Sequence, residues 1–362
     1  MKTIKILTSH AVPGMKVAED IYTEDNNLII PEGTSLTDNI ITRLEFYSIE
    51  ELLVRSDEEI ILAKAEADHV EQTYFTRIKR SESFQRFHKA YTNSISNLKD
   101  GLDDIVSNSS EPDMDFILSE VNKILRYSDT NIDLFHMLHC IRHYDDTTYI
   151  HSLNVSLICN IMGRWLSFNE DEMKIITICG LLHDIGKLMI PSDIIKKPDT
   201  LTDEEFKTVK GHPIEGYKLL RESNLDDRIK CSILMHHERC DGSGYPYGLQ
   251  SNEINSYAKL VAIADVYDAM TSARVYRGPM CPFDVVNVFE TEGFRKYDPK
   301  YVMTFMEGIS NTYINTDVRL SNKQEGTVIF INRMSLSKPV VRVKDEFIDL
   351  SKKKDLKIEA II

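Results

Sequence analysis

The stretch DEMKIITICGLLHDIGK, residues 171–187, decides the fold that the sequence predicts. Its centre is an unbroken apolar run over residues 175–182, which we interpret as a helix buried in a core. The run ends on the adjacent pair His183-Asp184. Such a pair can cap a helix, and imidazole and carboxylate are also preferred ligands of divalent transition metals. The stretch therefore predicts a helical core and leaves both interpretations of its polar end open.

Outward from this stretch, the sequence is predicted to be mainly α, with β structure near both ends. Long helical periodicities fill the middle, whereas strand periodicity with period two marks the C-terminal part. The predicted parts are a small α+β unit over 1–56, a helical linker or scaffold over 57–143, a helical catalytic domain over 144–316 and a β segment over 317–362. For the linker, a packing scaffold is favoured over a dimerisation surface, so a homodimer is the secondary hypothesis.

Composition excludes several classes of function. The formal net charge of -14 argues against bulk electrostatic binding of DNA or of an anionic membrane. The N-terminal residues contain no apolar run of the length that a signal peptide or membrane span needs, which predicts a cytoplasmic protein. The six cysteines show no Cys-x-x-Cys spacing, so we expect reduced core thiols and neither a zinc ribbon nor a disulfide framework.

Five of the 11 histidines fall in the predicted catalytic domain, at the ends of apolar helices or facing into them. A single inward histidine is usually a satisfied core residue, and a single His-Asp pair can be a cap. Separate structural reasons for a whole set are less plausible than one shared site. The set is His151, His183, Asp184, His212, His236, His237 and Asp265. Seven ligands exceed what one four- to six-coordinate ion needs, so two metals are the natural number, and the mixture of imidazole and carboxylate suits iron, manganese or zinc.

These residues lie in stretches that resemble a known family. The stretches are HDIGK at 183–187, GHP at 211–213, HHERCDGSGYP at 236–246 and IADVYDAMTS at 263–272, followed by Arg274, Tyr276 and Arg277. In order and spacing they resemble the HD-GYP family of the HD superfamily of metal-dependent phosphohydrolases. The resemblance covers roughly residues 144–310. It implies a bacterial signalling enzyme that hydrolyses cyclic di-GMP to pGpG, and in some cases to GMP, with a metal-activated hydroxide.

The resemblance also implies roles for individual residues. The seven residues of the set match the metal ligands of the family, with Asp184 as the bridging carboxylate. Lys187 matches the lysine that contacts the scissile phosphate and helps to protonate the leaving oxygen. Tyr245 lies beside the substrate, and Arg274 and Arg277 match basic positions that hold phosphate. The resemblance therefore implies two bound metal ions, with iron or manganese expected.

The sequence departs from the family at one position and leaves alternatives open. Some members bind a third metal through a glutamate where this chain has Thr147, so two metals are expected, although Asp145 and Asp146 lie nearby. A cyclic-dinucleotide sensor with little turnover, a hydrolase of cyclic GMP-AMP and an oxygen-activating di-iron protein are the alternatives. No residue supports a GGDEF-type partner protein.

Overall fold

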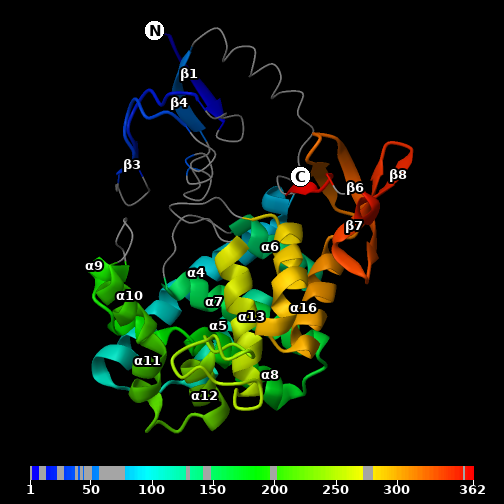
Figure 1. The fold of residues 1–362 in the computed structure, drawn as a ribbon. Coiled ribbons are helices and arrows are strands. Elements are labelled where there is room, and N and C mark those ends of the chain that lie inside the picture. The colour runs from blue at the N-terminus through cyan, green and yellow to red at the C-terminus, as the bar shows by residue number, and fades with distance from the viewer. Residues whose placement is uncertain are drawn as a thin grey trace.

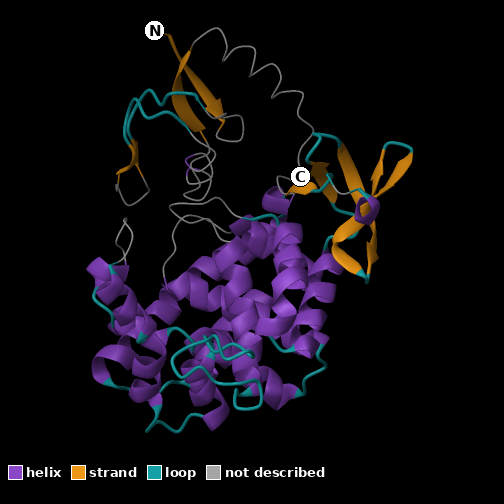
Figure 2. Ribbon diagram, in the orientation of Figure 1, coloured by secondary structure: helices purple, strands orange, loops and turns teal. Residues whose placement is uncertain are grey.

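The computed structural model describes residues 2–7, 14–22, 28–36, 40, 44, 51–56, 78–127, 131–141, 148–195, 202–271, 280–353 and 355–362. Within them the protein is mainly helical with small sheets, as predicted from the sequence (Figures 1 and 2). No helix of the described part combines the length and the apolar character that crossing a membrane requires.

The first helices along the chain are α4 (Glu82–Asn108), α5 (Met114–Leu125), α6 (Asn131–Ile141), α7 (Thr148–Trp165), α8 (Glu170–Leu182) and the 3-10 helix η2 (Ile185–Met189). They are followed by α9 (Ser192–Ile195), α10 (Asp203–Lys210), α11 (His212–Leu220), α12 (Asp227–Met235) and α13 (Ser256–Thr271). The last ones are α14 (Pro282–Val288), the π-helix η3 (Phe289–Gly293), α15 (Phe294–Lys296) and α16 (Pro299–Thr312).

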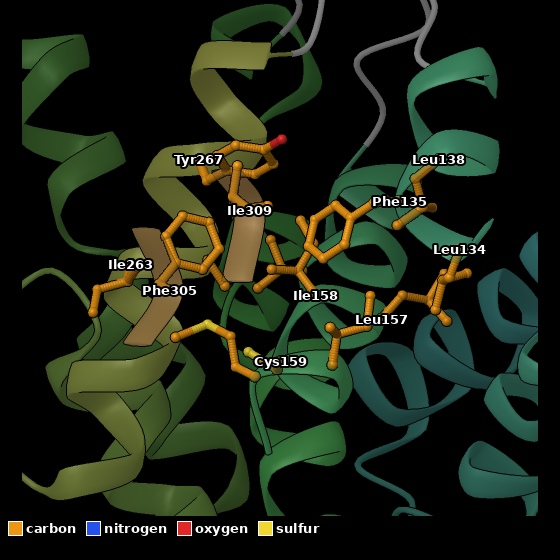
Figure 3. Close-up of a cluster of buried hydrophobic side chains, with 14 of the residues drawn as sticks. Leu134, Phe135, Leu138, Leu157, Ile158, Cys159, Ile263, Tyr267, Phe305 and Ile309 are labelled. Carbon is orange, nitrogen blue, oxygen red and sulfur yellow. The ribbon is translucent and has the colours of Figure 1, made fainter. Parts of the chain in front are cut away.

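The central helix is α7, whose residues from His151 to Gly163 are all buried. Ile158 of this helix lies among Phe135 of α6, Tyr267 of α13 and Phe305 of α16 (Figure 3). The rings pack edge to face, with centroids 6.0 Å apart for Phe135 and Tyr267 and 5.1 Å apart for Tyr267 and Phe305. Such pairs add to the free energy gained by burying the apolar surface. Helix α7 is therefore packed against α6, α13 and α16, which come from distant parts of the chain.

Helix α8 is fixed at its start and against its neighbour. Asn169 and Glu172 form a capping box that satisfies the first backbone N–H groups. At Gly180 the helix approaches α7 so closely that a Cβ atom would lie 2.7 Å from the Ser156 Cα atom. This backbone-to-backbone contact sets the height at which the C-terminal end of α8 meets α7.

The N-terminal strands β1 (Lys2–Leu7), β2 (Ile21–Tyr22), β3 (Leu28–Ile30) and β4 (Glu51–Ser56) form two antiparallel pairs, β1 with β4 and β2 with β3. Their buried side chains, among them Ile6, Leu52 and Val54, make a small core of their own.

The C-terminal strands are β5 (Asp317–Leu320), β6 (Glu325–Asn332), β7 (Ser335–Val343), β8 (Glu346–Asp349) and β9 (Ile358–Ile361), with the 3-10 helix η4 (Leu350–Lys352) between the last two. They form one antiparallel sheet in the order β8-β7-β6-β5-β9. The buried residues Val318, Leu336 and Val341 belong to the same core as the helices. The sheet thus extends the helical core, and the four-part division of the chain stays a prediction.

Candidate metal centre

The seven predicted ligands come from five helices and meet in the interior. His151 lies in the first turn of α7, and Asp265 lies in α13. His183 caps the C-terminal end of α8 and His236 that of α12, so Asp184 and His237 follow directly. His212 is the first residue of α11. The polar side chains are therefore delivered mainly by helix ends, where the chain can turn away from the apolar core.

The ligand atoms divide into two groups. Within each group they lie within 4.8 Å of one another, and the groups are Asp184 with His212, His236 and His237, and His151 with His183 and Asp265. This cluster could hold metal ions of the kind that bind imidazole and carboxylate.

Asp184 faces both groups, with one oxygen toward each. Its Oδ1 atom lies 3.0 Å from the Nε2 atom of His212 and 3.6 Å from that of His236. Its Oδ2 atom lies 3.3 Å from the Nε2 atom of His183 and 3.5 Å from that of His151. A carboxylate placed in this way can bridge two cations.

Backbone carbonyls fix the tautomers of three histidines. The Nδ1 atoms of His183, His212 and His236 lie 2.8, 2.7 and 2.8 Å from the carbonyl oxygens of the residues three positions earlier. Because a carbonyl oxygen can only accept, each Nδ1 must donate a proton, which leaves a lone pair on each Nε2 when the ring is neutral.

These lone pairs point at one another and at carboxylate oxygens. The Nε2 atoms of His212 and His236 are 3.2 Å apart. The Nε2 atom of His183 and the Oδ1 atom of Asp184 are buried without a hydrogen-bond partner. Acceptors crowded together in a buried place are costly unless a cation lies between them. These nitrogen and oxygen atoms therefore form a set of ligands that fits bound metal ions.

The charges of the cluster follow from burial and from its neighbours. Burial lowers the pKa of His236 to about 4, and burial together with His236 lowers the pKa of His237 well below its usual value. Burial opposes the ionisation of Asp184, yet His183 and Lys187 beside it hold the pKa of this carboxyl well below its usual range. Two ligands are thus neutral imidazoles and one is a carboxylate at neutral pH, as metal binding requires.

His151 is held between two carboxylates. Its Nε2 atom lies 3.0 Å from Asp265 Oδ1, and its Nδ1 atom lies 2.9 Å from Asp268 Oδ2. Burial disfavours the charged ring, but these two carboxylates outweigh it and raise the pKa of His151 to about 10. Asp268 was not among the predicted site residues. Its position one helical turn after Asp265 on α13 was the signal that could have identified it.

Lys187 and Tyr245 lie beside the cluster. The Nζ atom of Lys187, in η2, is 2.5 Å from Asp184 Oδ2. The ring of Tyr245 stacks on that of His237, with centroids 4.6 Å apart and an interplanar angle of 24°. Burial raises the pKa of Tyr245, so its hydroxyl stays protonated.

The loop that carries Tyr245 is organised by Glu238, which is buried. Its carboxylate accepts hydrogen bonds from the backbone N–H groups of Tyr247 and Leu249, at 2.7 and 2.9 Å. Glu238 and Arg239 are adjacent and oppositely charged, yet their side chains do not form an ion pair with each other. The Arg239 guanidinium instead donates to the carbonyls of His236 and Glu238 and lies over the ring of Tyr297.

Comparison with known proteins shows what this part of the chain is similar to. Residues 135–301 match the family model described as HD domain. Over 201 residues the chain is 34% identical to the cyclic di-GMP phosphodiesterase PA4108 of Pseudomonas aeruginosa, covering 55% of this chain and 48% of that protein. Residues 135–301 therefore match an HD domain, and this part of the chain resembles a curated cyclic di-GMP phosphodiesterase.

Other relatives differ in the substrate that they are named for. The chain is 34% identical over 204 residues to a cyclic di-GMP phosphodiesterase of Thermotoga maritima, covering 56% of this chain and 55% of that one. It is 38% identical over 146 residues to the 3'3'-cGAMP-specific phosphodiesterase 1 of Vibrio cholerae, covering 40% and 34%. The chain spans about half the length of these curated relatives, or less.

A solved HD-GYP-like structure has the same fold. It is the HDG"Y"P protein Bd1817 from Bdellovibrio bacteriovorus, with a TM-score of 0.50 and 17% sequence identity, over 84% of this chain and 98% of that one. At this identity the likeness concerns the fold alone.

Some predicted HD-GYP residues lie outside the described part of the chain. They are Arg274 and Arg277, expected to hold phosphate, and Thr147, which bears on a third metal. The structure brings together the other nine predicted site residues. These are His151, His183, Asp184, Lys187, His212, His236, His237, Tyr245 and Asp265.

Proposed function

We propose that this chain is a metal-dependent phosphodiesterase that hydrolyses cyclic di-GMP to linear pGpG. The product analysis below decides whether pGpG is cut further to GMP. The observation that carries the proposal is the division of the ligands into two groups with one oxygen of Asp184 directed at each. Two divalent ions held there, with iron or manganese favoured by the ligand set, would activate water and withdraw charge from the phosphodiester.

The residues around the cluster have defined tasks in this proposal. Asp184 holds the Lys187 ammonium beside the metal groups, where it can stabilise charge on the phosphoryl oxygens and give a proton to the departing ribose oxygen. Tyr245 presents an aromatic face next to His237, against which the nucleotide can lie. Arg274 and Arg277 remain the predicted phosphate contacts.

A second substrate has a specific observation in its favour. One of the relatives is named as specific for 3'3'-cGAMP, and it is 38% identical to this chain over the aligned part. Cyclic GMP-AMP shares the phosphodiester ring and differs in one base, so the metal cluster alone does not distinguish it. Either substrate would place the protein in the cytoplasm. Homodimer formation through the helical scaffold stays a prediction.

Product analysis tests the proposal. The protein is purified without oxygen, supplied with Fe²⁺ or Mn²⁺ and incubated with cyclic di-GMP or cyclic GMP-AMP, and the linear products and mononucleotides are separated by chromatography. We expect pGpG from cyclic di-GMP and none from the His183→Ala/Asp184→Ala double variant. His88→Ala is the matched control, because His88 is half-buried on α4 outside the cluster. If metal is bound and neither dinucleotide is cleaved, the proposal is wrong, and a binding role replaces it.

A further inference from the structure

Lys210 is a cation at the edge of the metal cluster to which the sequence assigns no role. It is the last residue of α10 and lies two residues before the candidate ligand His212. Its side chain is exposed, and in the part of the chain that the structure describes no carboxylate lies within ion-pair distance of it.

Two aromatic rings flank the Lys210 ammonium. Its Nζ atom lies 4.9 Å from the centroid of Phe206, one turn earlier on α10, and 5.1 Å from the centroid of Tyr245. The Tyr245 ring is the one that stacks on His237. A continuous row therefore leads from the metal cluster through Tyr245 to Lys210 and Phe206.

Lys210 and Phe206 could both make further favourable contacts with a bound molecule. An ammonium over an aromatic face at an exposed site is held weakly. The Phe206 side chain remains 52% exposed, although burying it would be favourable. A molecule with an anionic group and a flat apolar face would satisfy both side chains at once.

The proposed substrate contains both features. A cyclic dinucleotide carries two phosphodiesters in one ring, and only the one being cut can lie at the metal cluster. The other keeps its negative charge, in a protein with a formal net charge of -14. A local cation is needed to hold it.

We propose that Lys210 and Phe206 form a second subsite, in which Lys210 binds the phosphodiester that is not cut and Phe206 stacks on the neighbouring base. The inference rests on the proposed function and names residues that select a cyclic dinucleotide over a small phosphodiester. The bases can stack because every base has an aromatic face.

Lys210 could instead serve only the C-terminal end of α10, where a positive charge favours the helix dipole. Lys207 lies in the same last turn and is also exposed. Within the described residues no aromatic ring or carboxylate pairs with Lys207. It is therefore a matched control, because it shares the role at the helix end and lacks the place beside Tyr245.

The test compares two substrates and four variants of the full chain loaded with Mn²⁺. The substrates are cyclic di-GMP and the small diester bis(4-nitrophenyl) phosphate, and the variants are Lys210→Gln, Lys210→Arg, Phe206→Ala and Lys207→Gln. In Lys210→Gln we expect the KM for cyclic di-GMP to rise about tenfold, as loss of one charge-assisted contact implies, with a smaller change in kcat. The preference for the dinucleotide over the small diester should fall by a similar factor. Lys210→Arg should restore most of the affinity, Phe206→Ala should also raise KM, and Lys207→Gln should behave as wild type.

Several outcomes would overturn the inference while the proposed function stands. They are an unchanged KM for cyclic di-GMP in Lys210→Gln, an equal loss for both substrates, or an equal effect of Lys207→Gln. Failure of the proposed function is seen separately, in wild-type protein that binds metal and cleaves no dinucleotide. Equilibrium binding of cyclic di-GMP then decides. Weaker binding by Lys210→Gln than by wild type supports the subsite, whereas equal binding, or no binding by wild type, overturns it. Circular dichroism verifies that each variant is folded.

Discussion

Four of the seven candidate metal ligands are oriented by a neighbour that is not itself a ligand. Carbonyls of α8, α10 and α12 hold the rings of His183, His212 and His236, and Asp268 holds that of His151. Partners of this kind fix the ring and its tautomer before any ion arrives. The site is therefore organised by the helices, which bring its acceptors close together.

His151 predicts that metal binding depends on pH. With a pKa of about 10, its ring carries a proton at neutral pH when no metal is bound. Binding an ion needs the lone pair on Nε2, so that proton must be released. The affinity for Mn²⁺ should therefore rise with pH, by up to about tenfold per unit between about pH 6.5 and 8.5. Calorimetric titration in buffers with different ionisation enthalpies measures both the affinity and the released proton.

A matched pair of variants ties this dependence to His151. Asp268→Asn keeps the shape of the side chain and removes its charge, so we expect metal affinity to fall by about 10- to 100-fold. It should also make the affinity less dependent on pH, because the pKa of His151 falls when one carboxylate is lost. Asp171→Asn, at an exposed position on α8, should change neither. An affinity that is the same at all these pH values would contradict this explanation.

Between elements, close backbone contacts align the helix ends. Gly186 in η2 packs on α11 so tightly that a Cβ atom would lie 2.0 Å from the carbonyl oxygen of His212 and 2.7 Å from the N atom of Gly216. The contact holds Asp184, which precedes η2, and Lys187 within η2 close to His212 at the start of α11.

Gly186→Ala should separate these two elements. The added methyl group meets backbone and cannot be accommodated by a side-chain rotation, so we expect a loss of about 1–3 kcal/mol in the free energy of unfolding. Metal affinity should fall as well, because the Asp184 carboxylate moves away from His212. Gly101→Ala is the control, since its methyl group would meet only the ring edge of Phe116 at 3.3 Å and alanine favours a helix interior. Urea unfolding and metal titration of both variants provide the measurements. An equal effect of the two substitutions would contradict the role given to the Gly186 contact.

Helix ends were the part of the site that the sequence could predict. An apolar run followed by His183-Asp184, or by His236-His237, reveals that a polar pair ends a buried helix. Which ends meet depends on contacts such as those of Gly180 and Gly186, which have no periodic signal in the chain. For the same reason Lys210 and Asp268 were missed. The partners of Glu238 could not be predicted either, because its two backbone donors lie nine and 11 residues away along an irregular loop.

At the scale of the whole molecule, the two β regions relate differently to the helices. The strands near the C-terminal end share the core of the helical domain, and the Glu290 carboxylate of η3 accepts hydrogen bonds from Leu336 and Ser337 of β7. Their alternation was predicted from the sequence, but their burial against α14 and α16 was not. Strand periodicity tells which side chains share a face of a sheet, not what covers that face.

Deleting each β region in turn tests whether it supports the helical core. Among the described residues, the core of the N-terminal strands has no buried side chain in common with the helical core. A chain without residues 1–56 should therefore keep its metal affinity and the main unfolding transition. A chain without residues 317–362 exposes the apolar faces of α14 and α16, and the lost burial of several side chains such as Val318, Leu336 and Val341 should cost more than about 5 kcal/mol. That is comparable with the whole stability of a domain, so this chain should unfold or aggregate.

Calorimetry and metal titration of the two shortened chains give the comparison. Equal loss of stability in both would mean that the N-terminal strands support the helical core through contacts beyond the separate cores described above. Retention of metal binding without residues 317–362 would mean that the sheet is dispensable for holding α13 and α16 around α7. Either result would change where the structural support of the metal cluster lies, because Asp265 and Asp268 reach the cluster from α13, which packs on α16 through Tyr267 and Phe305.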